Sequence, residues 1–283
     1  MSYVSPSAVL DAAIEAGAAK SRLSTTQMLV RGAFAGAILG CATTFAFTAT
    51  LQTGLPIVGS ILFPVGFVMI VLLGLELVTG SFALIPLAVL EGRATVRGML
   101  KNFGLVIVGH LLGCAGYLLL YVAVITRMGT DTSDPMIGQI LAVAEAKTGS
   151  YEAIGLSGLA LVVIKAILCN WMVTLGAVLA FTSTATGGKV LAMWLPVTTF
   201  FALGFEHAVV NMFVIPAGML LGADVSFADW WAWNQLPVLA GNLVGGVLLT
   251  AALLYLSHRR VPVRAASGAG AAVPVAVPTS APA

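Results

Sequence analysis

The fold is decided by one stretch of the chain: Gly204-Phe205-Glu206-His207-Ala208-Val209-Val210-Asn211-Met212-Phe213. It lies inside an apolar run from Val190 to Leu221, which exceeds the ~20 residues that a membrane-spanning helix needs. Polar and charged side chains at such depth cost free energy unless they face a cavity or a partner. A polar centre beside a glycine is typical of a helix broken within the membrane, whose free backbone groups line a pathway. Two ordinary helices joined by a loop are the alternative, but each part is too short to cross alone.

The composition indicates a membrane protein. Of the 283 residues, 59% are hydrophobic and 8% are charged, and the mean hydropathy is +1.04. Soluble domains of this size do not have such a composition, so we expect a polytopic integral membrane protein. The first apolar run begins near Met28, after a charged segment, which predicts that no signal peptide is cleaved. Nothing in the sequence suggests nucleic acid as a partner.

The cysteines do not indicate a metal site. Cys41, Cys114 and Cys169 all lie in apolar runs, and their spacing fits no metal-binding motif. We therefore expect them to be small buried apolar side chains, and we expect neither a metal nor a cofactor.

A second overlong apolar run, Leu55 to Leu90, has the same features as the first. Its interior reads Gly74-Leu75-Glu76-Leu77-Val78-Thr79-Gly80-Ser81, so that an acid and glycines again interrupt an apolar stretch. Uninterrupted spans are predicted at about 28–50, 103–125, 154–182 and 236–256, with a polar connection at 126–151. The sequence therefore predicts an all-α integral membrane protein with six spans, of which the second and the fifth are broken.

The ends of the chain differ from this central part. Residues 1–27 contain an amphipathic helix, from Ser5 to Ser24, that would lie on the membrane surface or dock over a pore mouth. Residues 28–257 form the transmembrane domain. Residues 258–283 are rich in alanine, proline, valine and glycine, and we expect a disordered cytoplasmic tail.

The distribution of the 13 lysines and arginines predicts the orientation. One predicted side of the membrane receives Lys20, Arg22, Arg31, Arg93, Arg97, Lys101, Lys189, Arg259, Arg260 and Arg264. The other side receives only Arg127 and Lys147, and Lys165 lies within a span. Because positively charged loops stay in the cytoplasm, we expect both termini there, with the protein integral to the cell (inner) membrane.

An internal repeat supports this layout. Four positions of the third span recur at the same spacing in the sixth: Asn102, Gly109, His110 and Gly113 against Asn234, Gly241, Asn242 and Gly245. Glu76 and Glu206 precede these positions by nearly the same distance. Each half then has three spans, and an odd number inverts the second copy. Inverted repeats with broken helices are typical of transporters and channels, with the site at the midplane.

His207 is the candidate for chemistry at the break. A lone buried histidine is most often structural, but the break, the adjacent Glu206 and the nearby Asn211 favour a role in a pathway. An imidazole can donate to an anion or transfer a proton near neutral pH. Glu206 would either orient the ring or hold backbone amides of the unwound turn.

Other polar residues within the spans are assigned more simply. His110 stands where the other repeat has asparagine, so we expect a hydrogen bond between packed helices. Asn170 would reach the His207 site. Lys165 would line a vestibule or pair with an acid at a subunit contact.

Three stretches resemble signatures of the formate/nitrite transporter family: Gly74-Leu75-Glu76-Leu77-Val78-Thr79-Gly80-Ser81, Ile167-Leu168-Cys169-Asn170-Trp171-Met172-Val173, and Gly204-Phe205-Glu206-His207 through Asn211-Met212-Phe213. The similarity extends from about Ser5 to Leu256. It implies an aquaporin-like fold with six spans per protomer, a homopentamer in the lipid bilayer, and no enzymatic activity. It also implies a pore in each protomer for formate, nitrite or similar small monovalent anions.

The resemblance assigns roles to individual residues. His207 would be the central pore histidine, Asn170 its hydrogen-bonding neighbour, and Thr79 a residue of the breaking loop that faces the histidine. Glu206 and Asn211 would belong to the same pathway. The constrictions would be formed by Phe63 and Phe200, with Phe67, Val78 and Val173 as further narrowing side chains.

Two positions depart from the family pattern. The vestibule lysine of the family corresponds to Lys147, which lies farther before Asn170 than the family spacing, so that an insertion falls between them. His110 occupies a position where the family usually has asparagine.

We therefore expect a passive or proton-coupled pore for small monovalent anions, with anions and protons as its partners. Another weak-acid anion, such as hydrosulfide or lactate, would suit the same pore. A membrane subunit of a haem oxidoreductase is the rival class, but it needs paired histidines on facing helices, and the chain has 3 histidines, one of them at a membrane edge. A simple membrane anchor would not account for two broken polar runs.

Overall fold

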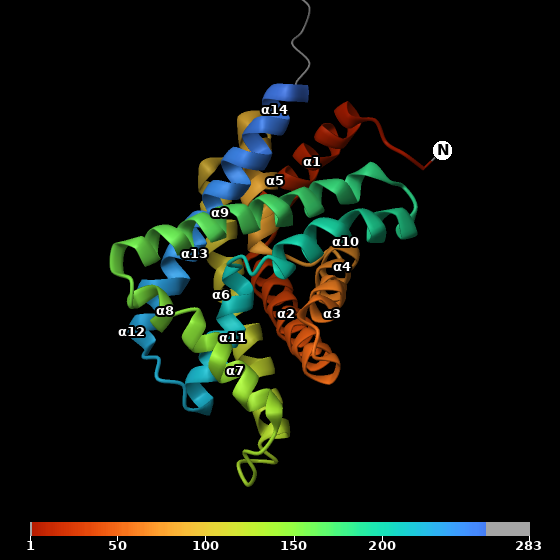
Figure 1. Cartoon of the computed structure of the whole chain (residues 1–283). Helices are drawn as coiled ribbons and strands as arrows, with labels where there is room; N and C mark the ends of the chain where they lie inside the picture. Colours follow the sequence, from red (N-terminus) through yellow and green to blue (C-terminus); the bar gives the residue numbers. More distant parts are fainter. Residues whose placement is uncertain (1, 259–283) are drawn as a thin grey trace, which may run out of the picture.

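The computed structural model describes residues 2–258, and its elements are helices (Figure 1). They are α1 (Pro6–Ser21), α2 (Thr25–Thr53), α3 (Pro56–Leu62), α4 (Pro64–Leu72), α5 (Val78–Leu90), α6 (Val96–Ile125), α7 (Pro135–Ala146), α8 (Gly149–Glu152), α9 (Gly155–Leu179), the 3₁₀ turn η1 (Ala180–Thr182), α10 (Thr186–Ala202), α11 (Ala208–Leu221), α12 (Phe227–Asp229), the π-helical η2 (Trp230–Gln235), α13 (Leu236–Val244), the π-helical η3 (Gly245–Ala252) and α14 (Leu253–His258). The predicted tail lies outside the described residues from Arg259 onward.

Four of the described helices are long and apolar enough to cross a membrane. They are α2, α6, α9 with its 3₁₀ end, and the continuous helix Phe227–His258. Shorter apolar helices, Pro56–Leu72, Val78–Leu90 and Ala208–Leu221, occupy parts of the two overlong runs. In Figure 1, α1 and α14 lie at one end of the molecule, and the connection between α6 and α7 projects from the opposite end. The chain is therefore an all-helical membrane protein.

Both overlong runs are interrupted by the same glycine cap. Gly74 follows α4 and Gly204 follows α10, each with φ of 63°, a left-handed conformation that glycine adopts without steric cost. The backbone N–H of the next residue then donates to a carbonyl five positions earlier, Leu75 to Ile70 at 3.0 Å and Phe205 to Phe200 at 3.1 Å. This motif ends a helix, and Figure 1 shows α11 leaving the end of α10 at a steep angle.

The N-terminal helix α1 docks against α5. Its face of Val9, Leu10, Ala13 and Ile14 is buried there. Gly17 makes the close approach possible, because a Cβ on this residue would lie 1.8 Å from the carbonyl oxygen of Leu84. The apolar face of the predicted amphipathic helix is therefore buried against α5.

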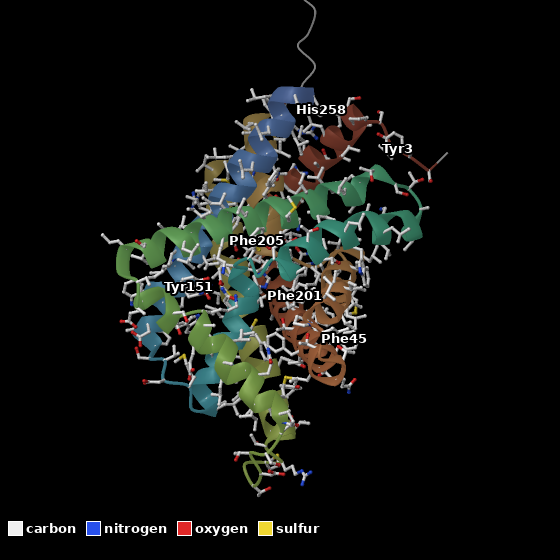
Figure 2. The ribbon with its side chains drawn as sticks, in the orientation of Figure 1. Tyr3, Phe45, Tyr151, Phe201, Phe205 and His258 are labelled. Carbon is white, nitrogen blue, oxygen red and sulfur yellow. The ribbon has the colours of Figure 1, made fainter. Side chains whose placement is uncertain are left out.

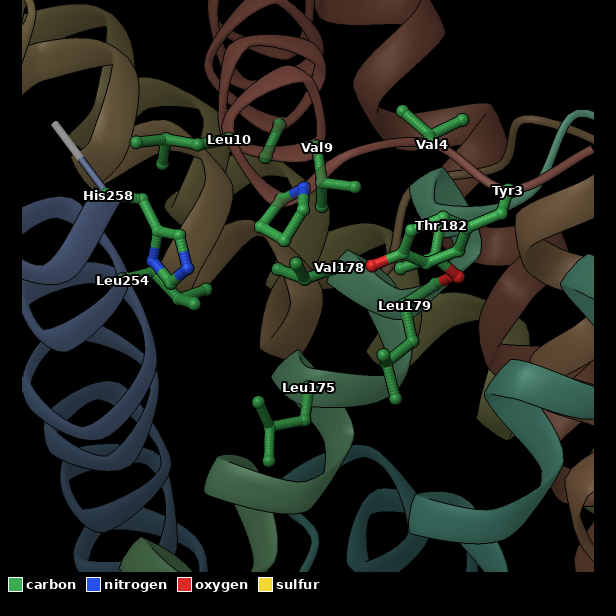
Figure 3. A pocket seen from close by; sticks show the side chains of 12 residues that line it. Tyr3, Val4, Val9, Leu10, Leu175, Val178, Leu179, Thr182, Leu254 and His258 are labelled. Carbon is green, nitrogen blue, oxygen red and sulfur yellow. The ribbon is translucent and has the colours of Figure 1, made fainter. Parts of the chain in front are cut away.

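An apolar pocket of about 250 Å³ lies beside this docked helix, between α1, α9 and α14 (Figure 3). The extended N-terminal residues close its edge, because the Val4 N–H donates to the Thr182 carbonyl at 2.9 Å. Tyr3 also pairs with Ser183 as an isolated bridge. Tyr3 and Val4 are therefore tied to η1 and to the residue that follows it.

The polar segment predicted at 126–151 contains a helix, α7, which its sequence did not indicate. The side chain of Asp134 caps the helix by accepting from the Met136 N–H, and Pro135 occupies its first turn. Ile137 and Ile140 are buried, and α7 packs along α11. The short helix has only one apolar face, which a search for continuous apolar runs does not detect.

The expectation for the cysteines is correct for two of three. Cys114 and Cys169 are buried, whereas Cys41 on α2 is exposed on the surface of the chain. In a membrane protein the outer face of a helix is apolar too, because it contacts lipid or a neighbouring subunit. The apolar sequence around Cys41 therefore did not show whether this side chain points inward or outward.

Candidate functional site: a buried histidine between two lysine-bearing cavities

Thr79 and His207 meet where the two interrupted runs approach each other. Thr79 Oγ1 lies 3.2 Å from His207 Nε2, and both residues are buried. His207 is the N-cap of α11, while Thr79 is in the first turn of α5 rather than in the preceding loop where we expected it. The pair therefore joins the N-terminal ends of two short helices, whose dipoles place partial positive charge at this point.

The hydrogen bonds of His207 define its tautomer. Its Nδ1 accepts from the backbone N–H of Val210 at 3.3 Å, since an amide nitrogen can only donate. In the neutral ring the proton is therefore on Nε2, directed toward Thr79 Oγ1. His207 can donate a hydrogen bond in this arrangement. To transfer a proton it must first be protonated at Nδ1, which releases the Val210 amide.

Asn170 contacts Thr79 rather than His207. Its Nδ2 donates to the backbone carbonyl oxygens of Thr79, at 3.1 Å, and of Asn242, at 2.5 Å. Within the described residues no hydrogen bond joins Asn170 to His207, so the expected direct bond between these two side chains is absent there. Asn170 lies beside the π-helical η3, since a Cβ on Gly246 would approach its Nδ2 to 3.0 Å. The amide therefore ties α9 to both the first turn of α5 and α13.

Glu206, next to His207, is held by side chains. It was expected to orient the imidazole or to hold backbone amides. In the described part of the chain its carboxylate accepts from Lys147 Nζ at 2.8 Å, Tyr151 Oη at 2.7 Å, Asn211 Nδ2 at 2.8 Å and Asn234 Nδ2 at 3.3 Å. The carboxylate is buried, and these four donors offset the cost of burying its charge.

Lys165 was expected to line a vestibule or to pair with an acid at a subunit contact. Within the chain its Nζ donates to the hydroxyl of Tyr151 at 3.3 Å and lies 5.7 Å from the centre of that ring. The Tyr151 hydroxyl in turn donates to Glu206 (Figure 2 shows the position of Tyr151). Lys165 therefore reaches the carboxylate through Tyr151, while Lys147 contacts it directly.

The first half of the chain repeats this arrangement with Lys20. Lys20 Nζ donates to Glu76 at 2.8 Å, and Asn102 Nδ2 bonds to both Glu76, at 3.2 Å, and the Lys20 carbonyl, at 3.1 Å. In the second half Asn234 likewise donates to the carbonyl of Lys147 at 2.8 Å. In the sequence Lys20 counts only as a charge near the membrane, although the repeat of glutamate and asparagine was the signal for a matching lysine.

Two cavities approach the centre, and each contains one of these lysines. The Lys147 cavity has a volume of about 130 Å³ and is lined by α7, the end of α10 and the first turns of α11, including Phe200, His207 and Asn211. The Lys20 cavity has a volume of about 120 Å³ and is lined by α1, α4 and α5, including Phe67. In Figure 1, α1 and α7 lie toward opposite ends of the molecule.

Aromatic side chains cluster beside His207, where Phe200 and Phe201 line the Lys147 cavity. Phe63 packs edge-on against Phe200, with ring centroids 5.7 Å apart, and stacks on Phe201 at 4.0 Å. Phe200 in turn stacks on the His207 ring at 5.5 Å. The other predicted constriction residues, Phe67, Val78 and Val173, are buried as well. His207 therefore packs against an aromatic cluster, and each of the two cavities contains a lysine that is ion-paired with a buried glutamate.

Such a site suits the passage of small anions. Lysines at cavities attract negative charge, helix N-termini stabilise it, and an apolar barrier excludes hydrated ions. Together with the helical membrane fold, this arrangement defines a membrane transport protein.

Comparisons with known proteins identify its family. The formate/nitrite transporter model matches residues 7–256, so the chain belongs to the formate/nitrite transporter family. It is 30% identical to "Uncharacterized transporter YrhG" of Bacillus subtilis, covering 92% of this chain and 96% of that protein. It is 37% identical to "Probable formate transporter" of Methanothermobacter thermautotrophicus, covering 69% and 73%. The solved structure "Pentameric formate channel with formate bound" has the same fold, with a TM-score of 0.68 at 23% identity over 83% of this chain and 98% of that one.

Proposed function

We propose that the protein conducts small monovalent weak-acid anions, formate and nitrite first among them, through a pore in each protomer. The observation that carries this proposal is the buried Thr79–His207 pair: His207 lines the Lys147 cavity, and Gly80, which follows Thr79, lines the Lys20 cavity. The names of the relatives support formate as a substrate.

The proposed mechanism follows from the energetics of anion transfer. A bare anion has a high free energy in an apolar constriction, whereas the neutral acid does not. Lys20 and Lys147 would concentrate the anion in the cavities, and the N-terminal ends of α5 and α11 would stabilise it near the centre. His207 would then donate a hydrogen bond or a proton, and the neutral acid would cross the phenylalanine barrier.

We propose an architecture to match. Each interrupted run, α3–α4 with α5 and α10 with α11, crosses the membrane once, which gives six spans in two inverted halves. The matching contacts of Lys20 with Glu76 and Lys147 with Glu206 support the two-fold relation. The protomers assemble as a homopentamer, and the fold shared with a pentameric formate channel supports this assembly. Both termini lie in the cytoplasm, and the protein resides in the inner membrane.

The test is flux into proteoliposomes with formate, nitrite, nitrate, lactate and hydrosulfide compared side by side. We expect formate and nitrite to pass much faster than nitrate, because nitrate is the anion of a strong acid and does not become neutral. Phe200→Ala opens the barrier and should raise the ratio of lactate to formate flux at least severalfold.

A matched control is Phe34→Ala, since Phe34 lies on the outer surface of α2 with 53% of its area exposed. This variant should keep the wild-type ratio. The absence of formate and nitrite flux in the wild-type protein would refute the proposed function. An unchanged lactate-to-formate ratio in Phe200→Ala would show that Phe200 is not part of the barrier.

A further inference from the structure

His110 is a buried side chain that the proposed mechanism does not use. Its Nδ1 lies 2.8 Å from the backbone carbonyl of Gly32 in α2, and its Nε2 lies 3.1 Å from the backbone N–H of Val78 in α5. A carbonyl only accepts and an amide N–H only donates. The ring is therefore neutral, with its proton on Nδ1, and both nitrogens are engaged by backbone groups of two other helices.

Asn242 makes the corresponding contacts in the second half of the chain. Its Oδ1 accepts from the backbone N–H of Ala208 at 3.0 Å, and its Nδ2 donates to the carbonyl of Ala166 in α9 at 2.8 Å. Val78 and Ala208 are the first residues of α5 and α11. His110 and Asn242 thus each accept a hydrogen bond from the first N–H of a short helix, α5 or α11. Each also donates to a backbone carbonyl of a long helix, α2 or α9, and so links the short helix to the long one.

These two first residues are the chain neighbours of the central pair. Val78 precedes Thr79, and Ala208 follows His207. The N-cap residue of α11, His207, accepts a hydrogen bond from the first turn of its helix, but the N-cap residue of α5, Leu77, has an apolar side chain that cannot do so. His110 Nε2 therefore supplies α5 with an acceptor that its own N-cap residue lacks. A displacement of the first turn of α5 would change the distance between Thr79 Oγ1 and His207 Nε2.

We infer that His110 is a positioning residue for transport: it fixes the first turn of α5, so that Thr79 stays within hydrogen-bonding distance of His207. This inference rests on the proposed function, because it assigns Thr79 to the pathway. It also explains why a histidine serves at a position whose counterpart is asparagine. Histidine and asparagine each provide one acceptor for the N–H at the start of a helix and one donor for a carbonyl of a neighbouring helix. The position requires both.

Substitutions at position 110 can test whether the hydrogen-bond acceptor or the volume of the side chain is what matters. In His110→Gln the amide oxygen reaches about as far from Cβ as Nε2 does, so it can accept from Val78. In His110→Leu the volume remains and the acceptor is lost, which leaves a buried N–H without a partner. Asn242→Leu removes the matching acceptor in the second half.

The first measurement is hydrogen–deuterium exchange of the purified protein. His110→Leu should raise exchange about tenfold in the peptide that covers residues 78–82, the scale expected for one lost buried hydrogen bond, and leave residues 208–212 unchanged. Asn242→Leu should produce the reverse pattern, and His110→Gln should resemble the wild type in both peptides. General loosening of the fold would affect both peptides in every variant and would contradict the inference, as would elevated exchange in His110→Gln.

The second measurement is formate flux at equal amounts of reconstituted protein. His110→Leu should lower flux about tenfold, and His110→Gln should restore most of it. If exchange follows the predicted pattern but His110→Leu transports like the wild type, Thr79 does not need this positioning and the inference is wrong. If the wild type itself carries no formate, the proposed function fails, and the exchange pattern still shows whether His110 holds α5. Should His110→Leu not assemble, His110→Ala replaces it in both measurements.

Discussion

At the scale of single residues, His207 has two tasks that draw on different atoms of one ring. Nδ1 caps α11 through the Val210 N–H, and Nε2 faces Thr79. Capping fixes the ring orientation, so the donor on Nε2 always points to the same place. The same bond opposes protonation of Nδ1, because the protonated ring has no acceptor for the Val210 amide. A proton relay at this position therefore has to compete with the cap.

The first prediction at this scale concerns His207→Asn. Asparagine is a good N-cap, so its Oδ1 can accept from the Val210 N–H, and the variant should fold and assemble. It retains a polar donor but has no group that titrates between pH 5 and 8, the range in which histidine changes charge. The rise of formate uptake with falling pH, which proton transfer by His207 predicts, should therefore flatten in this range.

The measurement is initial formate uptake into liposomes from pH 5 to 8, with a trapped dye that reports internal pH. Histidine can supply its proton only where the ring is charged, so the wild-type advantage should be present at the acidic end and disappear toward pH 8. A variant with the wild-type pH profile and the same number of protons per anion would show that His207 is only a hydrogen-bonding wall residue.

At the scale of elements, the sequence predicts the breaks because their causes are local. Gly74 and Gly204 supply the left-handed residue, and the adjacent glutamates mark the polar centre. The lysine that faces each glutamate could not be predicted in this way. Lys20 is separated from Glu76, and Lys147 from Glu206, by one span and half of the next, so only tertiary packing of α1 and α7 brings them together. Neither helix is apolar enough to be recognised as a span.

The repeat could have indicated these pairs. Its sequence signal is strongest in α6 and α13, where asparagine and glycine recur, and it fades in α1 and α7, where the repeated features are a short amphipathic helix and one lysine. The hydrogen bonds of Asn102 and Asn234 with these lysines restore the correspondence. Side-chain roles at the centre, such as Asn170 bonding to the Thr79 carbonyl, depend on ångström-scale packing that spacing does not encode.

The prediction at this scale concerns the docking of α1. Gly17→Leu places a side chain where the Leu84 carbonyl now lies, so α1 should move off α5 and Lys20 should leave Glu76. We expect a loss of about 1–3 kcal/mol in stability, as for other overpacked contacts, and a clear fall in formate flux. Ala19→Leu is the matched control, because Ala19 is exposed on the same helix.

Thermal unfolding and flux should be measured together for both variants. Gly17→Leu should lower the unfolding temperature and reduce flux, and Ala19→Leu should change neither by much. Equal behaviour of the two variants would mean that α1 does not need to pack on α5 for transport.

At the scale of the whole molecule, a single chain contains every part of the proposed pathway. Lys20, Thr79, Lys147 and His207 belong to one protomer, and both cavities are lined by its own helices. The outer surface carries large exposed apolar side chains on several helices, among them Leu120 and Leu195, which are 72% and 73% exposed. Lipid and neighbouring subunits would cover this surface in the membrane.

The last prediction concerns the proposed assembly, with one pore in each protomer. Native mass spectrometry in mild detergent should show a homopentamer, and monomers alone would contradict the proposed assembly. Pentamers should then be formed from mixtures of wild-type subunits and a transport-dead subunit, such as Thr79→Val if it assembles normally. If each protomer holds a complete pathway, as we propose, formate flux should fall in direct proportion to the wild-type fraction. A steep, cooperative fall would mean that subunits share a pathway or must act together, and the assignment of one pore to each protomer would then be wrong.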